Sequence, residues 1–433
     1  MNSKALSIAI ALLLPSLGIA QERITIEDCY QWARENYPDI QRYELIEKTE
    51  DYSLSNINKG WLPQISVNAK ASYQSDVTQL PFDSEKISSL IPGFSIPTMS
   101  KDQYQATAEI DQKIWDGGKA KSAKGIVRSS ADVEKKRLEA DLYAVQQRVN
   151  QLFFGSLLHS ELLKQNRLLQ KQLQTNLHRI EAMKANGTAN ASDQQLLQVE
   201  LLQAKQKETE LSASQEAFLL MLSHLTGREM DASSRLAIPQ EAARLSDQIN
   251  RPELQAMEAN KALFQSQEKQ LESGLRPQLG LFLQGGYGRP GLNMLDNDFN
   301  PFYIAGIRLS WNIGNLYTLK NDRRKIATNT RMMDIQQETF RFNTRLEMLQ
   351  QQTEIKKLSA LKQADEEILR LRTAVRQAAE AKQENGILST TDLVREITAE
   401  DLARQQLATR HIQHIAAVYN HLYLGGTEEL NKK

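Results

Sequence analysis

Proline is absent from two long windows of this chain, residues 98–238 and 302–433, although the chain contains 11 prolines. Proline breaks helix interiors, so its absence over such lengths permits unusually long helices. Within the first window, apolar residues recur at spacings of three, four or seven: Leu162, Leu169, Leu173, Leu177, Ile180 and Met183. This is the apolar stripe of a helix that packs along other helices. A helix over 119–185 would be on the order of 100 Å long, which suits a coiled coil or a tube.

The chain repeats itself once. Pro38-Asp39-Ile40-Gln41 matches Pro252-Glu253-Leu254-Gln255 at an offset of 214 residues, and Asn186-Gly187 matches Asn385-Gly386 at an offset of 199. The change of offset falls between Tyr287 and Tyr303, which predicts a shorter loop in the second half. We therefore divide the chain into sequence segments: a signal peptide (1–20), a first repeat (21–227), a linker (228–248), a second repeat (249–426) and a C-terminal tail (427–433).

Each repeat contains two segments in which the hydrophobic period changes to two, the period of a β-strand. They lie near 64–74 and 103–115 in the first repeat and near 278–288 and 302–314 in the second, and each pair precedes a long helical hairpin, 118–227 or 317–426. Each strand has one apolar and one polar face. The charged residues of the polar faces are Lys70, Glu109, Asp111, Lys113 and Arg308. The length of each predicted strand is close to the roughly 9–11 residues that cross a bilayer. A half-buried sheet in a soluble protein would show the same alternation.

The first twenty residues have the pattern of a secretory signal peptide, with Lys4 before a short apolar run and small residues at Gly18 and Ala20. No later stretch reaches 18 consecutive apolar residues, so membrane contact would have to come from strands in a closed barrel. The 53 basic and 53 acidic residues balance, which does not favour a nucleic-acid partner. The single cysteine, Cys29, excludes an internal disulfide.

Four strands from one chain cannot close a barrel, and open sheet edges are not tolerated in lipid. Several chains would have to pool their strands. Eight strands would give a barrel filled by its own side chains, whereas twelve strands from three chains would leave a pore lined by the polar faces. The expected fold class is α+β, with long helices that continue a barrel of pooled strands as a tube; in a trimer this barrel would have 12 strands.

The order of short motifs resembles the TolC family of outer-membrane efflux proteins over almost the whole mature chain. The motifs are Asn36-Tyr37-Pro38, Gly60-Trp61-Leu62-Pro63, Gly274-Leu275-Arg276-Pro277, Ile114-Trp115-Asp116-Gly117-Gly118 and the two Asn-Gly turns. The resemblance implies a homotrimer in the lipid of a Gram-negative outer membrane. It also implies a periplasmic tunnel that docks to a periplasmic adaptor and an inner-membrane transporter of the RND or ABC type. The alternative is a passive porin or a surface structural protein, which would not need the long helices.

The hairpin turns carry the candidate site residues. Glycine ends a helix in the left-handed conformation, so Asn186-Gly187 and Asn385-Gly386 mark the turns between long helices. Asp193 and Asp392 follow six residues after each glycine, where they can cap the next helix. The resemblance implies that the turn residues contact the adaptor and that Asp392 belongs to an acidic ring at the periplasmic entrance. A further aspartate of that ring is replaced by Arg395, so the ring would be close to neutral.

Other candidate chemistry is weak. His411, His414 and His421 share a helical face, but polar positions of a helical bundle explain them better than a metal site. Cys29 has no basic neighbour in sequence that would activate a thiolate. We expect no catalytic residues, no cofactor and no metal, and therefore no enzyme.

Overall fold

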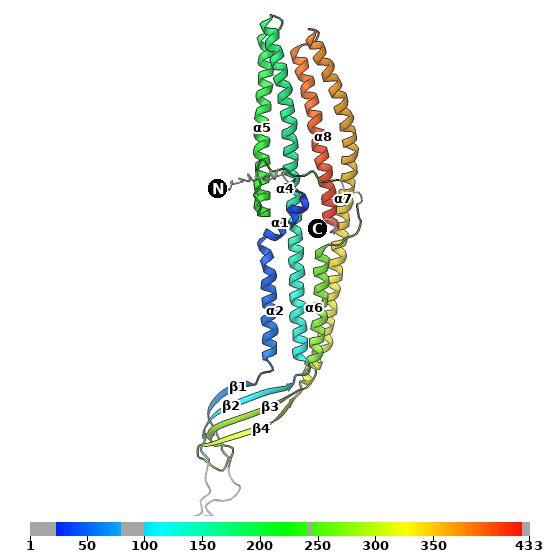
Figure 1. The fold of residues 1–433 in the computed structure, drawn as a ribbon. Helices are drawn as coiled ribbons and strands as arrows, with labels where there is room; N and C mark the ends of the chain where they lie inside the picture. Colours follow the sequence, from blue (N-terminus) through cyan, green and yellow to red (C-terminus); the bar gives the residue numbers. More distant parts are fainter. Residues whose placement is uncertain (1–22, 79–98, 241–244, 427–433) are drawn as a thin grey trace, which may run out of the picture. The chain divides into compact units, whose positions relative to one another are not determined.

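The computed structural model describes residues 23–78, 99–240 and 245–426 (Figure 1). The predicted signal peptide and C-terminal tail lie outside the described residues, as do part of the predicted linker and most of the loop between the first two strands. Among the described residues, every helix is too short or too polar to cross a bilayer.

The chain forms two compact units, and neither corresponds to one sequence repeat. The first unit comprises Met1–Ile40, Asp141–Arg251 and Phe342–Lys433, and the second comprises Gln41–Ala140 and Pro252–Arg341. Each unit therefore takes segments from both repeats, and the two longest helices, α4 (Lys119–Ala185) and α7 (Leu316–Glu384), each belong partly to both.

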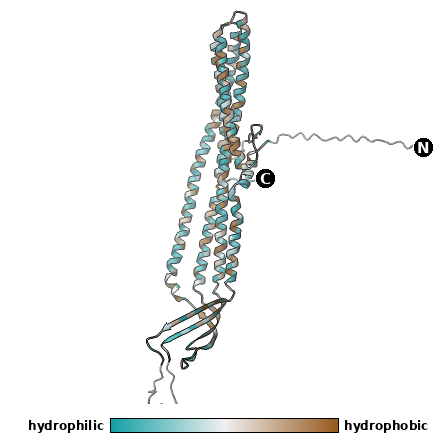
Figure 2. Cartoon of the chain, turned by 90° about the vertical axis from the view of Figure 1, so that its left-hand side faces the viewer, coloured by the Kyte–Doolittle hydropathy of each residue, from teal (hydrophilic) through white to brown (hydrophobic). Residues whose placement is uncertain are grey.

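In the second unit, α2 (Arg42–Lys59), α6 (Pro252–Gly274) and the beginnings of α4 and α7 run side by side (Figure 1). Small side chains bring α4 and α6 close together: the hydroxyls of Ser122 and Ser273 are 2.7 Å apart, and those of Ser129 and Ser266 are 2.8 Å apart. Lys261 on α6 forms an ion pair with Asp334 on α7 at 3.1 Å. Polar contacts thus link these helices, along which hydrophilic and hydrophobic residues are mixed in Figure 2.

The same unit carries one antiparallel sheet in the order β1 (Gln64–Tyr73), β2 (Asp102–Trp115), β3 (Gln278–Arg289) and β4 (Asn300–Ser310). The strands β1 and β4 are its edges. The predicted fourth strand, near 302–314, is wrong at its end. Asn312 accepts a hydrogen bond from the Gly314 N–H at 3.1 Å and starts the 3-10 helix η2 (Ile313–Asn315), so Ile313 leaves the strand despite its favourable alternation.

The first unit contains α1 (Ile26–Asn36), α5 (Ala191–Thr226), α8 (Thr390–Gly425) and the remaining parts of α4 and α7. It also contains the beginning of the 3-10 helix η1 (Pro38–Gln41). Thr25 caps α1 in a capping box with Asp28. One apolar core gathers α1, α4, α5, α7 and α8 around Ile26, Val149 and Phe153, all of which are fully buried.

A second core of this unit lies along α4, α5 and α8. It contains Leu173, Leu177 and Ile180 of the predicted stripe, with Leu169 and Met183 packed against it, and it joins them to Leu197 of α5 and Ile397 of α8. The heptad-like stripe of the sequence therefore packs helices against one another, as its spacing predicted.

Candidate functional site

One face of the sheet is apolar and exposed. Directly opposite residues of neighbouring strands share a face, and the register places Ile65, Ile110, Leu283 and Ala305 in one row across all four strands. The large apolar side chains of this face remain accessible: Ile65, Val67, Tyr73, Ile110, Leu281, Leu283, Tyr287, Tyr303, Ile307 and Leu309. Val67 is 77% exposed and Ile307 70%. A contiguous apolar surface of this kind marks a contact with a membrane or another protein.

Aromatic residues lie at both ends of the strands. Tyr73, Tyr104, Tyr287 and Tyr303 lie on the apolar face near the loop ends of the strands. Trp61, Trp115 and Trp311 lie at the other end, where the strands meet the helices. Such aromatic belts are typical of the two interfaces of a membrane-spanning sheet.

A β-bulge brings Trp115 into the apolar face. Lys113 lies opposite Gly280, but the register then shifts and Trp115 lies opposite Leu279. Without the shift, alternation would place Trp115 on the polar face together with Lys113. Sequence periodicity alone missed this irregularity, because the alternation before it is regular.

The opposite face of the sheet is polar. The register places Lys70, Glu109, Asp111, Lys113 and Arg308 on this face, in agreement with the sequence pattern. Arg308 donates hydrogen bonds to Glu109 at 2.7 Å and to Asp111 at 2.9 Å. One arginine therefore partly balances two acids on the adjacent part of the sheet.

The polar face also carries two phenylalanines that the alternation did not predict. A Cβ on Gly306 would lie 2.9 Å from the Phe282 ring, and a Cβ on Gly286 would lie 2.4 Å from the Phe302 ring. Each ring thus covers a glycine of the neighbouring strand, and the Arg308 guanidinium lies 4.7 Å from the centroid of Phe282. The glycines of β3 and β4 are the sequence signal for this arrangement.

The turn from β2 into α4 is built by Asp116. Its carboxylate accepts hydrogen bonds from the N–H groups of Gly118 at 2.8 Å and Ala120 at 2.6 Å. Gly117 has φ +69°, and a Cβ there would lie 2.8 Å from the Cβ of Arg276, so glycine is required for two reasons. The motif Trp-Asp-Gly-Gly therefore fixes the junction of strand and helix.

The two hairpin turns have the same geometry. In the first, the N–H of Thr188 bonds to the carbonyl of Met183 at 2.9 Å and that of Gly187 to the carbonyl of Lys184 at 3.0 Å. In the second turn, the N–H groups of Ile387 and Gly386 make the equivalent bonds, at 2.9 and 3.0 Å. This is the Schellman motif. Asn186 and Asn385 precede the glycines, whose φ angles are +75° and +70°.

The second turn exposes an apolar side chain that sequence reasoning did not select. Ile387 is 74% exposed, at the position that Thr188 occupies in the first turn. A Cβ on either turn glycine would meet nothing within 4 Å, so the backbone conformation alone requires glycine. Both turns leave their surface open to a partner.

Asn190 and Ser389 cap the helices that follow the two turns, and Asp193 and Asp392 are their partners three residues later. Asp193 accepts a hydrogen bond from the Asn190 N–H at 3.1 Å, and Asp392 accepts one from the Ser389 hydroxyl at 2.7 Å. Asp392 also lies 3.3 Å from the Arg395 guanidinium. The Asp193 carboxylate therefore completes a capping box with Asn190, whereas the Asp392 carboxylate is held by the Ser389 hydroxyl and by Arg395.

A buried charge cluster joins α7 and α8, and sequence reasoning did not find it. Glu400 is 0% exposed and accepts hydrogen bonds from Arg376 at 2.7 Å, Arg404 at 2.6 Å and Thr373 at 2.9 Å. At the repeat offset of 199, Arg376 corresponds to Leu177 and Glu400 to Leu201, both of which lie in the apolar core. Comparison of the repeats at these positions was the available signal.

Asp401 lies next to this cluster and is almost completely buried. Burial raises the pKa of its carboxyl to about 6, and the hydrogen bond from Gln405 and the charge of Arg404 oppose that rise. One carboxylate oxygen, Oδ1, has no hydrogen-bond partner among the described residues. The ionised form of Asp401 is therefore poorly solvated.

The remaining sequence candidates show no arrangement for chemistry. Burial raises the pKa of the Cys29 thiol to about 12, so the reactive thiolate is disfavoured. His414 and His421 are buried, and burial lowers the pKa of His421. Within the described ranges, His, Cys, Asp and Glu form no group of three that could hold a metal ion.

No known family profile matches the sequence, and no curated protein matches it. Solved structures do match. CusC, whose structures concern folding and transmembrane channel formation, shares 14% identity over 93% of this chain and 92% of its own, with a TM-score of 0.67. The outer-membrane protein VceC of Vibrio cholerae shares 12% identity over 92% of this chain and 96% of its own, with a TM-score of 0.64.

The CmeC outer-membrane channel of Campylobacter jejuni covers 98% of this chain and 93% of its own, with 12% identity and a TM-score of 0.62. At these identities the likeness shows the fold. The predicted fold class, long helices with four antiparallel strands per chain, is confirmed, and so is the resemblance to TolC-family channels at the level of the fold.

Proposed function

We propose that this chain forms the outer-membrane channel of a tripartite efflux or type I secretion system in a Gram-negative bacterium. The observation that carries the proposal is the exposed apolar face of the sheet with its aromatic ends, in a chain with the fold of outer-membrane channels. Such a face is costly in water and favourable in lipid. The polar face of the same strands would then line the passage.

The proposed assembly is a homotrimer with a 12-stranded barrel. The two edge strands, β1 and β4, leave backbone groups that lipid cannot satisfy, so neighbouring chains would pair them. A second feature supports association between copies. Six exposed apolar residues lie along α7: Phe342, Leu346, Leu349, Ile368, Leu371 and Val375. In a trimer, a neighbouring copy would cover these side chains.

Export by this duct requires no chemistry by the chain itself. Lys70, Glu109, Asp111, Lys113 and Arg308 would line the pore, and water and solute would pass them without bond making or breaking. We therefore expect neither catalytic activity nor a cofactor.

The turn surfaces would dock a periplasmic adaptor, which in turn meets an inner-membrane RND or ABC transporter. Asn186-Gly187 and Asn385-Gly386 hold both turns in one geometry, and Ile387 adds an exposed apolar contact. Near the second turn, Asp392 and Arg395 are the candidates for a closed entrance, with Asp193 as the corresponding residue of the first repeat.

A passive porin or a surface structural protein is the alternative function. Either could use the sheet, but neither needs two helical hairpins with identically built turns. The 67-residue α4 and the 69-residue α7 therefore favour the duct.

The test is to express the chain, with its adaptor and transporter, in a Gram-negative strain that lacks its own efflux channel. We expect a detergent-stable trimer in the outer membrane and restored export of a transporter substrate. Gly386→Ala should reduce export several-fold without reducing the trimer, because alanine disfavours the left-handed turn by roughly 1–2 kcal/mol. Gly125→Ala is the matched control, since its added methyl also meets open space but lies within a helix. A monomer with intact export, or export that does not depend on the chain, would contradict the proposal.

A further inference from the structure

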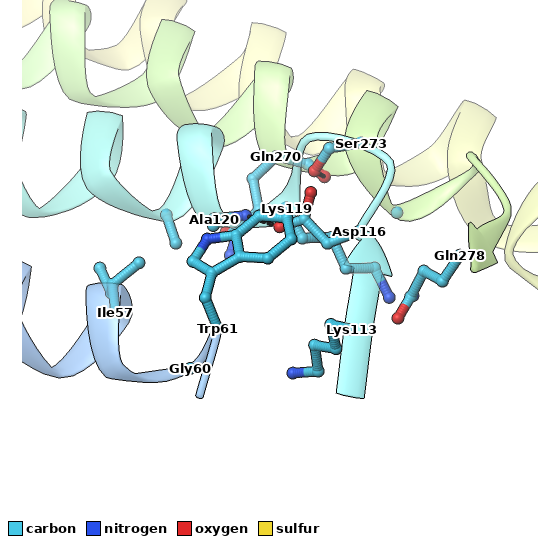
Figure 3. Close-up of a pocket in the computed structure, with 12 residues that line it drawn as sticks. Ile57, Gly60, Trp61, Lys113, Asp116, Lys119, Ala120, Gln270, Ser273 and Gln278 are labelled. Carbon is cyan, nitrogen blue, oxygen red and sulfur yellow. Dashed lines mark hydrogen bonds between the residues drawn. The ribbon is translucent and has the colours of Figure 1, made fainter. Parts of the chain in front are cut away.

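An open pocket of about 410 Å³ lies in the second unit, where the helices meet the sheet (Figure 3). Its walls come from the end of α2, the end of β2, the beginning of α4 and the end of α6. Trp61, Lys113 and Lys119 line the pocket, and Figure 3 shows the Trp61 indole between the end of α2 and the beginning of α4. Ile57 and Ala120 add apolar surface. This volume suits a small organic molecule rather than a lone ion.

The charge of the pocket is positive. No ion pair formed by residues 23–78, 99–240 or 245–426 involves Lys113 or Lys119. Asp116 also lines the pocket, but its two carboxylate oxygens are engaged by the N–H groups of Gly118 and Ala120. The two ammonium groups are therefore available to a ligand, and with the charge of Asp116 included the lining keeps a net charge of +1.

The register indicates which side of the sheet gives access to the pocket. Lys113 lies opposite Gly280, which lies opposite Arg308, and Gln278 lies opposite Ser310. These residues belong to the polar face, and Lys113 and Gln278 also line the pocket. A ligand would therefore arrive from the polar side of the sheet rather than from its apolar face.

We propose that this pocket binds an amphipathic organic anion, such as an aromatic carboxylate. Lys113 and Lys119 would hold its negative charge, and the indole of Trp61 would contact its ring. The inference rests on the proposed channel function, because it makes the pocket a stopping point for exported solutes along the polar wall. The inference therefore assigns a class of bound ligand to one site on the proposed pore wall.

The experiment measures binding and does not require transport. The full chain is reconstituted in nanodiscs of zwitterionic phosphatidylcholine and titrated with 2-naphthoate by calorimetry, with neutral 2-naphthamide as the comparison ligand. We expect naphthoate to bind more tightly than naphthamide. Lys113→Gln and Lys119→Gln should each weaken naphthoate binding about tenfold, the loss expected for one charged contact. Lys121→Gln is the matched control, because Lys121 lies on the same helix and does not line the pocket.

Equal binding of the two ligands, or naphthoate binding that neither lysine variant weakens, would overturn the proposal. A second arm repeats the titration in nanodiscs that contain anionic phosphatidylglycerol. Unchanged binding supports a solute site, whereas complete competition would assign the pocket to lipid headgroups and overturn the solute assignment. A trimer that exports normally and does not bind naphthoate would refute this inference and leave the proposed function standing.

Discussion

At the scale of single residues, the second repeat buries a charged pair at two positions where the first repeat buries leucines. Arg376 and Glu400 make a 2.7 Å ion pair in α7 and α8, and their counterparts are Leu177 and Leu201. Breaking a buried pair costs about 3–5 kcal/mol, whereas replacing it by packed apolar residues is often neutral. We therefore expect Glu400→Leu to lower the unfolding midpoint strongly and the double variant Arg376→Leu/Glu400→Leu to recover part of it, because Arg404 and Glu380 lose a partner in the double variant. Thermal unfolding followed by circular dichroism measures both, and a double variant less stable than Glu400→Leu would contradict this reasoning.

Asp401 makes a separate, pH-dependent contribution. Because burial raises its folded-state pKa to about 6, above the ordinary value of 3.8, the proton binds more tightly in the folded protein. Its favourable contribution is complete below about pH 4 and is lost as the pH rises through 6. Stability measured at pH 5 and pH 7.5 should therefore differ less in Asp401→Asn than in the parent protein, by on the order of 1–2 kcal/mol. An identical pH dependence in the two proteins would show that this carboxyl is already solvated.

At the scale of elements, the sequence predicted the long helices and four strands because proline absence and hydrophobic period are local signals. The structure differs from the predicted strands at two places, and in each the cause is local and does not show in the hydrophobic period. Asn312 ends β4 by capping the next turn, and the bulge after Lys113 moves Trp115 to the apolar face. The charge cluster around Glu400 depends on which helices meet, and a single helical pattern does not contain that information.

The polar face of the sheet allows a prediction about ion selectivity. Arg308 binds both Glu109 and Asp111, so Arg308→Ala would leave two uncompensated carboxylates on the proposed pore wall. We expect a shift of the reversal potential toward cation selectivity in a potassium chloride gradient, with trimer formation retained. Gln105→Ala is the control, because Gln105 lies opposite Lys70 on the same face and carries no charge. A reversal potential that is unchanged by Arg308→Ala would place this face away from the conducting path.

At the scale of the whole molecule, sequence repeats and compact units divide the chain differently. The repeat was visible in the sequence because each half keeps its own junction and turn motifs. The units were not visible, because each is assembled from both halves by contacts between distant segments. The Asn-Gly turn residues could be predicted because both repeats contain them. The exposed Ile387 could not be predicted, because it belongs to no repeated motif.

The proposed entrance depends on three copies, so its prediction belongs to the assembly. The Ser389 hydroxyl caps α8 by accepting a hydrogen bond from the Asp392 N–H at 3.1 Å, and the Asp392 carboxylate lies 3.3 Å from Arg395. In the first repeat, Asp193 forms a capping box with Asn190, and Leu196 occupies the position that corresponds to Arg395. If three copies of Asp392 meet at a closed entrance, Arg395→Ala should expose an acidic ring. Single-channel current should then become sensitive to multivalent cations added on the side of the helical turns.

The double variant Arg395→Ala/Asp392→Ala should lose that sensitivity and still form trimers. Asp193→Ala combined with Arg395→Ala is the matched control, because it removes the corresponding aspartate of the first repeat and keeps the acid at position 392. A cap alone contributes about 0.5–2 kcal/mol of local stability and leaves conductance unchanged. Cation block that persists in the Asp392 double variant, or that never develops in Arg395→Ala, would leave both aspartates as helix caps and place the constriction elsewhere along the helices.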